Sequence, residues 1–174
     1  MSSRINRSLI GLVLSFALLS PMFTMQVQAK NDHASGGGTY FVKPGIRSEF
    51  QFSESHVQCK IGHGVLPDGT ILQMLMLSTT VDSVVIDSVT GTVTITGTMI
   101  STTRLRFTDG TKVSLTETVP YSAMAQDNGK PGAGADFFSL TVDYVDTPEL
   151  DQFDVFGSPA TFSGVLESGN VIVR

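Results

Sequence analysis

Strict alternation of apolar and polar residues is the feature that most constrains this chain. Between Thr92 and Met99 the sequence reads TVTITGTM, with threonine at every second position. Successive side chains of a β-strand point to opposite faces of a sheet, so a period of two predicts a strand with one buried face. Similar runs recur along the chain, beginning near Phe50, Val57, Leu105 and Phe138. The sequence therefore predicts an all-β fold.

Turn signals separate these runs. Five segments combine Gly with Pro, Asp, Asn or Ser, and they are Lys43–Gly45, Pro67–Gly69, Asp109–Gly110, Asp127–Gly129 and Ser168–Asn170. Such residues tolerate the backbone angles of tight turns. About nine or ten short strands joined in this way predict a single antiparallel β-sandwich or a meandering barrel.

The alternation also predicts which residues form the core. Eight residues lie at the apolar positions of their strands, and they are Val93, Ile95, Leu105, Phe107, Leu115, Phe138, Leu140 and Val142. Glu117 occupies an apolar position of its run as well. We expect a bulge near Pro120 or a sheet-edge position to expose it, the alternative being a buried carboxylate beside Arg104 or Arg106.

The N-terminus has the pattern of a secretion signal. Arg4 and Arg7 precede an apolar run from Leu9 to Leu19, and small residues at Val27–Ala29 offer a cleavage site. The run is shorter than the about 20 apolar residues of a membrane-spanning helix. We therefore expect a signal peptide at 1–29, a flexible lead-in at 30–38 and one domain at 39–174. The protein is expected in the periplasm or outside the cell, without a membrane span after cleavage.

The charge balance restricts the partners. Removing Arg4 and Arg7 leaves nine basic residues against 16 acidic ones, a net charge of −7. An acidic domain whose sequence shows no basic stripe is an unfavourable partner for nucleic acid or for an anionic membrane surface. We expect a protein or surface partner of unknown identity.

Three segments carry a resemblance to a known family. They are Gly36–Phe41 (GGGTYF), Asp127–Leu140 (DNGKPGAGADFFSL) and Gly164–Val173 (GVLESGNVIV). Over residues 36–174 the chain resembles the small secreted bacterial β domain that follows choice-of-anchor modules in larger surface proteins. The family has no established activity, so the resemblance implies an exported β domain and no catalytic residue. The apolar run Ile71–Leu77 and the segment Pro148–Pro159 depart from the family pattern.

Two acidic segments are candidate calcium sites. Asp127, Asn128 and Asp136 bracket a glycine-rich loop, and a second segment places five carboxylates between Asp143 and Asp154. Calcium takes six to eight oxygen ligands, and extracellular sites are often weak. Neither segment has the spacing of an EF-hand. The alternatives are a hairpin connection at the first segment and a solvated loop at the second, so we expect any calcium to bind weakly.

Two other groups could bind metals but are better explained by packing. A regular strand would place His56 and Cys59 on opposite faces and His63 about 13 Å from Cys59, too far for one zinc ion unless the strand bends at Gly62 or Gly64. Cys59 is therefore expected to be an unpaired, buried thiol. The thioethers of Met74 and Met76 suit Cu(I). We instead expect the strand at 71–77 to be covered on both faces, one by the core and the other by the molecule itself or by a partner.

No pattern of catalytic residues emerges. The chain has three histidines and no G-x-S-x-G motif, which disfavours nucleophilic catalysis. We expect neither an enzyme nor a resident cofactor, apart from the weak calcium described above. The sequence fits an exported non-catalytic binding or structural module. The alternatives are a carrier of a small apolar ligand inside a barrel and a weak calcium-binding surface module. A filled core favours the module, whereas an interior pocket favours the carrier.

Overall fold

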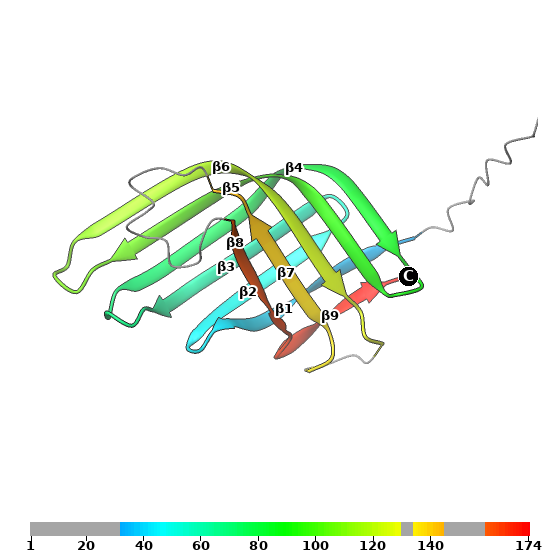
Figure 1. Cartoon of the computed structure of the whole chain (residues 1–174), viewed down its shortest axis with the longest axis horizontal. Helices are drawn as coiled ribbons and strands as arrows, with labels where there is room; N and C mark the ends of the chain where they lie inside the picture. The colour runs from blue at the N-terminus through cyan, green and yellow to red at the C-terminus, as the bar shows by residue number, and fades with distance from the viewer. Residues whose placement is uncertain (1–31, 130–133, 145–158) are drawn as a thin grey trace, which may run out of the picture.

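The part of the protein that the structure describes forms one antiparallel β-sheet of nine strands (Figure 1). The computed structural model describes residues 32–129, 134–144 and 159–174. The strands are β1 (Ala34–Lys43), β2 (Ile46–Ser53), β3 (His56–Val65), β4 (Ile71–Asp87), β5 (Thr92–Arg106), β6 (Lys112–Gln126), β7 (Phe137–Val142), β8 (Ala160–Val165) and β9 (Ser168–Val173). The predicted all-β fold is confirmed. In the described part of the chain, no helix has the length and apolar character that crossing a bilayer requires.

The sheet curls into a half-barrel. Its strand order is β8-β7-β6-β5-β4-β3-β2-β1-β9, so two strands that are consecutive in the chain, β8 and β9, occupy opposite ends of the sheet. Figure 1 shows β7 and β8 crossing over the β1–β2 end. Two hydrogen bonds hold this arrangement: the Tyr40 hydroxyl in β1 donates to the Phe162 carbonyl in β8 at 3.3 Å, and the Glu167 amide donates to the Thr39 carbonyl at 2.8 Å.

The predicted faces are largely confirmed. Six of the eight expected core residues are buried, and they are Val93, Ile95, Leu105, Phe138, Leu140 and Val142. Phe107 and Leu115 are only half-buried, so the prediction is wrong for these two. They lie where β5 and β6 project beyond β7, which pairs only with Tyr121–Gln126 of β6. Pattern alone does not show where a neighbouring strand stops.

An aromatic cluster fills the space inside the curl. The ring of Phe138 stacks on that of Phe50 with centroids 4.1 Å apart, and Tyr40 packs against both rings at 5.8 and 5.9 Å. Phe52 adds a further stacked ring on the same side. These contacts join β1 and β2 to β7, although four strands lie between β7 and β2 in the sheet. The cluster therefore stabilises the curvature itself.

The first strand begins earlier than the sequence predicts. β1 starts at Ala34 and includes Gly36–Gly38, which pair with β2 on one side and β9 on the other, within the segment expected to be flexible. A Cβ at Gly36 would lie 2.6 Å from the Phe52 ring, and one at Gly38 would lie 2.2 Å from the Ser168 carbonyl. The glycines therefore permit close packing rather than flexibility.

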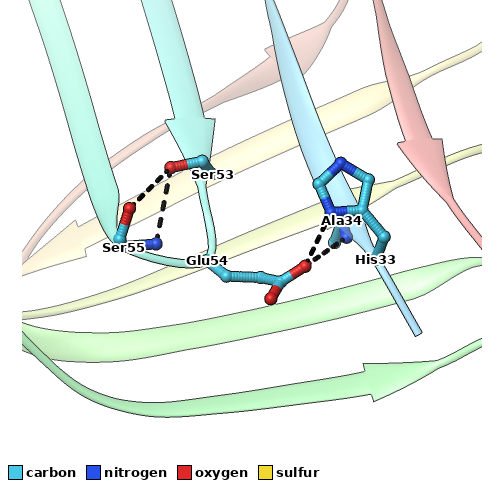
Figure 2. A network of polar contacts seen from close by, with 5 residues as sticks. All are labelled: His33, Ala34, Ser53, Glu54 and Ser55. Carbon is cyan, nitrogen blue, oxygen red and sulfur yellow. Dashed lines mark hydrogen bonds and ion pairs between the residues drawn. The ribbon is translucent and has the colours of Figure 1, made fainter. Parts of the chain in front are cut away.

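A carboxylate anchors the start of β1 (Figure 2). Glu54, in the turn between β2 and β3, accepts a hydrogen bond from the Ala34 amide at 3.1 Å and lies 2.8 Å from Nδ1 of His33. Ser53 and Ser55 brace the same turn, their hydroxyls 3.3 Å apart. The backbone of His33 also pairs with Arg174 through two hydrogen bonds. The β1 strand is thus fixed to both of its neighbours at this end.

Aspartates close the hairpin turns of the long strands. Asp68 accepts the Thr70 amide at 2.9 Å, and Asp109 accepts the Thr111 amide at 2.8 Å in the same Asp-Gly-Thr sequence. These backbone hydrogen bonds lower the pKa of both carboxyls. Gly69 and Gly110 adopt φ angles of +87° and +88°, which glycine reaches without strain. The turns set the register of the β3–β4 and β5–β6 hairpins.

Glu117 lies at an edge of the described sheet. The β5–β6 register is continuous from the pair Thr92–Gln126 to the pair Arg106–Lys112. The bulge expected near Pro120 is therefore absent from this strand pair. β7 begins its pairing at Tyr121, which leaves Glu117 beyond its reach. The edge alternative is therefore the one observed. Glu117 is half-buried, and desolvation raises its pKa.

Candidate functional site

The predicted calcium residues lie together at the junction with the last strand. Asp127 follows β6, Asp136 precedes β7, and both reach β9. Asp127 accepts hydrogen bonds from the amides of Gly129 (2.8 Å) and Val173 (3.2 Å). Asp136 is fully buried and accepts the amides of Asn128 (3.1 Å) and Val171 (2.8 Å). Each of the four carboxylate oxygens therefore accepts a hydrogen bond from one backbone N–H.

This arrangement explains how two neighbouring carboxylates are tolerated. Backbone amides donate hydrogen bonds to both carboxylates and thereby compensate their negative charge. The Asn128 side chain also donates to the Ala135 carbonyl. Asp127 and Asp136 thus attach β9 to the β6–β7 connection. Residues 130–133 of the loop, and all of the second acidic segment except Asp143, lie outside the described residues, as do the signal peptide and most of Pro148–Pro159.

The calcium assignment stays a prediction. Over the described ranges, no group of three or more His, Cys, Asp or Glu side chains is arranged to hold a metal ion. An ion at this junction would share oxygens that already accept amide hydrogen bonds.

The two histidines and the cysteine of β3 do not lie together. Cys59 is a free, fully buried thiol, as predicted, and lies 3.1 Å from the Ser48 hydroxyl. Burial raises its pKa. His56 is half-buried beside Ser78, whereas His63 is exposed where the β3–β4 register shifts between Ile61 and Gly64. The irregularity turns His63 away from Cys59 instead of bringing the two together.

The strand at 71–77 has one covered and one partly open face. Met74 and Met76 are both buried in the core, on the same face, as predicted. Leu75, on the other face, is 38% exposed, so the described part of the chain does not cover this face, and its cover by a partner stays a prediction. This outer face is where charged residues gather.

Cationic side chains from three strands meet on the outer face of the projecting hairpins. The register places Ile71, Arg106 and Lys112 side by side across β4, β5 and β6. The next row contains Gln73, Arg104 and Ser114. Directly opposed residues of an antiparallel pair point to the same face. We call the four cations Lys60, Arg104, Arg106 and Lys112, together with His63 and the residues between them, the cationic groove.

The surface is hollowed here. One depression of about 420 Å³ is lined by His63, Ile71, Gln73, Arg104, Leu105, Arg106, Lys112, Val113 and Ser114. A second, of about 310 Å³, is lined by Lys60, Ile61, Gly62, Gln73, Met74, Leu75, Thr102 and Arg104. Gln73 and Arg104 border both, so the two depressions adjoin each other. No acidic residue of the described chain lines either one.

Among the described residues, no carboxylate forms an ion pair with a cation of the groove, although Glu49 lies directly opposite Lys60 in the β2–β3 pair. The ion pairs His33–Glu54 and Arg47–Glu167 both lie elsewhere. Arg106 and Lys112 are directly opposite each other. Like charges in this position destabilise a sheet. An acidic protein therefore concentrates unpaired positive charge at one place, at a cost that a bound anion would offset.

Sequence reasoning missed this site because the charges are far apart in the chain. Lys60 and Lys112 lie on strands that meet only through β4 and β5. One signal was available: Arg104, Arg106 and Lys112 flank the Asp109-Gly110 turn, and a tight hairpin there aligns Arg106 with Lys112. The expectation of no basic stripe therefore describes the linear sequence and not the folded surface.

Comparison with known proteins adds no family. No family model matches the chain, and no curated protein or solved structure shows significant similarity to it. Functional inference therefore depends on the site itself.

Proposed function

We propose that this protein is an exported, non-catalytic binding module that binds an anionic ligand through the cationic groove. The observation that carries the proposal is the gathering of four cationic residues, together with His63, around two adjoining depressions that no carboxylate of the described chain lines. Guanidinium groups form paired hydrogen bonds with carboxylate, sulfate or phosphate oxygens. Export is supported by the signal pattern at 1–29, and a module role by the resemblance over 36–174.

The core supports a module over a carrier of apolar ligands. Phe138, expected to line an interior pocket in a carrier, instead stacks on Phe50 and packs against Tyr40. Leu140, Val93 and Ile95 are buried on the same side of the sheet. A side chain whose surface is occupied by other side chains offers little to a ligand.

As the finer description of the fold, we propose a meandering barrel rather than a sandwich. Its support is the set of hydrogen bonds that link the far ends of the sheet. The Leu166 amide donates to the Asp136 carbonyl at 2.9 Å, and the Glu167 amide donates to the Thr39 carbonyl. The Asp136 carboxylate also accepts a hydrogen bond from the Val171 amide. These hydrogen bonds connect β7 and β1 through the short link between β8 and β9.

Charge neutralisation tests the proposed function. Calorimetric titration with dextran sulfate should show binding that falls at least about tenfold in the double variant Arg104→Gln/Arg106→Gln, since two charges facing the ligand are lost. Arg174→Gln removes a positive charge at the far C-terminus and serves as the control. Arg106→Gln removes one of the two like charges that face each other at Arg106 and Lys112. It should therefore also leave the melting temperature unchanged or raise it. Equal affinity of the double variant and the wild type would refute the proposal.

A further inference from the structure

The cationic groove is longer than a small anion requires. It extends from Lys60 on β3 to Lys112 on β6, three strand spacings, or about 14 Å. Arg104 lies between these ends and borders both depressions. A single carboxylate or phosphate would contact only one or two of the cations. The dimensions fit a ligand that extends across several strands.

The exposure of the cations leads to the same conclusion. Lys60, Arg104, Arg106 and Lys112 are all exposed. A contact with one exposed charge contributes little, because water and salt screen it. Several such contacts made by one chain add up, because each later contact is intramolecular. Useful affinity therefore requires a polymer with repeated negative charges.

The side chains between the cations indicate the kind of polymer. Gln73, Thr102 and Ser114 offer amide and hydroxyl groups, and Ile71 and Leu75 offer apolar surface. No Phe, Tyr or Trp of the described chain lines the groove, whereas proteins that bind single-stranded nucleic acid generally stack bases on such rings. Sugar rings combine hydroxyl groups with apolar C–H faces and suit this lining. We infer that the ligand is a negatively charged polysaccharide, an assignment that rests on the proposed function.

A length series tests this assignment. The purified chain is titrated with galacturonate monomer and with its dimer, tetramer and hexamer, and the affinity is measured by calorimetry. The hexamer should bind at least about tenfold more tightly than the monomer, since it reaches several cations at once. The gain with length should be lost in Arg104→Gln/Arg106→Gln and kept in Arg174→Gln. Dextran sulfate oligomers of equal length distinguish sulfate from carboxylate as the anionic group.

The controls separate the two proposals. Monomer binding as tight as hexamer binding would overturn the polymer assignment, and a single-stranded DNA hexamer that binds more tightly than the galacturonate hexamer would overturn the polysaccharide assignment. Either result would leave an anion-binding groove in place. Neutral dextran that binds as well as the charged polymers, or a failure of every anion to bind, would contradict the proposed function as well.

Discussion

The ring of Phe138 in β7 stacks on the ring of Phe50 in β2, with centroids 4.1 Å apart and planes inclined by 15°. Four strands separate β7 from β2 in the sheet, so this contact exists only because the sheet curls. The curl buries the inner face and leaves the outer face of the long hairpins open to solvent. The position of the cationic groove follows from it.

Phe138→Ala should strongly destabilise the protein. The ring is fully buried, and truncating a buried phenylalanine costs about 3–5 kcal/mol. Urea unfolding monitored by circular dichroism measures the loss. Phe41→Ala is the matched control, because Phe41 is 48% exposed and should change the free energy of unfolding by less than about 1 kcal/mol. Similar effects of the two substitutions would contradict the packing described for β7.

Asp136→Asn should loosen the last strand. An amide supplies one acceptor oxygen where the buried carboxylate supplies two, so either the Asn128 or the Val171 amide loses its partner. An unsatisfied buried group costs about 1–3 kcal/mol. Hydrogen exchange should accelerate at Val171, while Asp82→Asn, at an exposed position, should leave it unchanged. Unaltered exchange at Val171 in the Asp136 variant would show that the carboxylate does not hold β9.

Acid should weaken the hairpin turns. The Thr111 backbone hydrogen bond lowers the pKa of Asp109 from 3.8, so its stabilisation is present above about pH 4 and disappears as the pH falls through the lower pKa of the folded state. Asp109→Asn keeps an acceptor oxygen but does not titrate. Its free energy of unfolding should therefore depend less steeply on pH between about 4 and 2. An unchanged slope would mean that this turn does not contribute to acid unfolding.

Cys59 should resist modification in the folded protein. The thiol is fully buried, and burial raises its pKa, so little thiolate is available to react. A thiol reagent monitored by mass spectrometry should label it slowly in buffer and rapidly in concentrated urea. Thr79→Cys places a second thiol at an exposed position and provides the positive control, since this thiol should be labelled rapidly in buffer. Fast labelling of native Cys59 would contradict its placement in the core.

Much of the fold could be predicted from local pattern. Alternation identified the buried faces of Val93, Phe138 and Leu140, because the period of two is a property of each strand alone. The early start of β1 could not be predicted, since three glycines indicate flexibility unless the neighbours that need their small size are known. In the same way, the half-burial of Leu115 depends on where β7 ends.

The candidate sites show the same limit. The sequence predicts that Asp127 and Asp136 lie near each other, because a hairpin brings the two ends of its loop together. Their attachment to β9 depends on Val171 and Val173, which approach only when the sheet curls. The cationic groove likewise depends on the register of four strands. Cross-strand register, including the irregularity at His63, is set by the whole sheet and not by any one segment.

Backbone amide NMR of the protein titrated with the galacturonate hexamer shows where the polymer binds. We expect the largest shift changes at Gln73, Arg104, Arg106 and Lys112, on the outer face of β4, β5 and β6. Amides beside Phe138 and Asp136 should change little, because they lie on the inner side and at the β9 junction. Largest changes at those inner positions, or none in the cationic groove at saturating hexamer, would contradict the account.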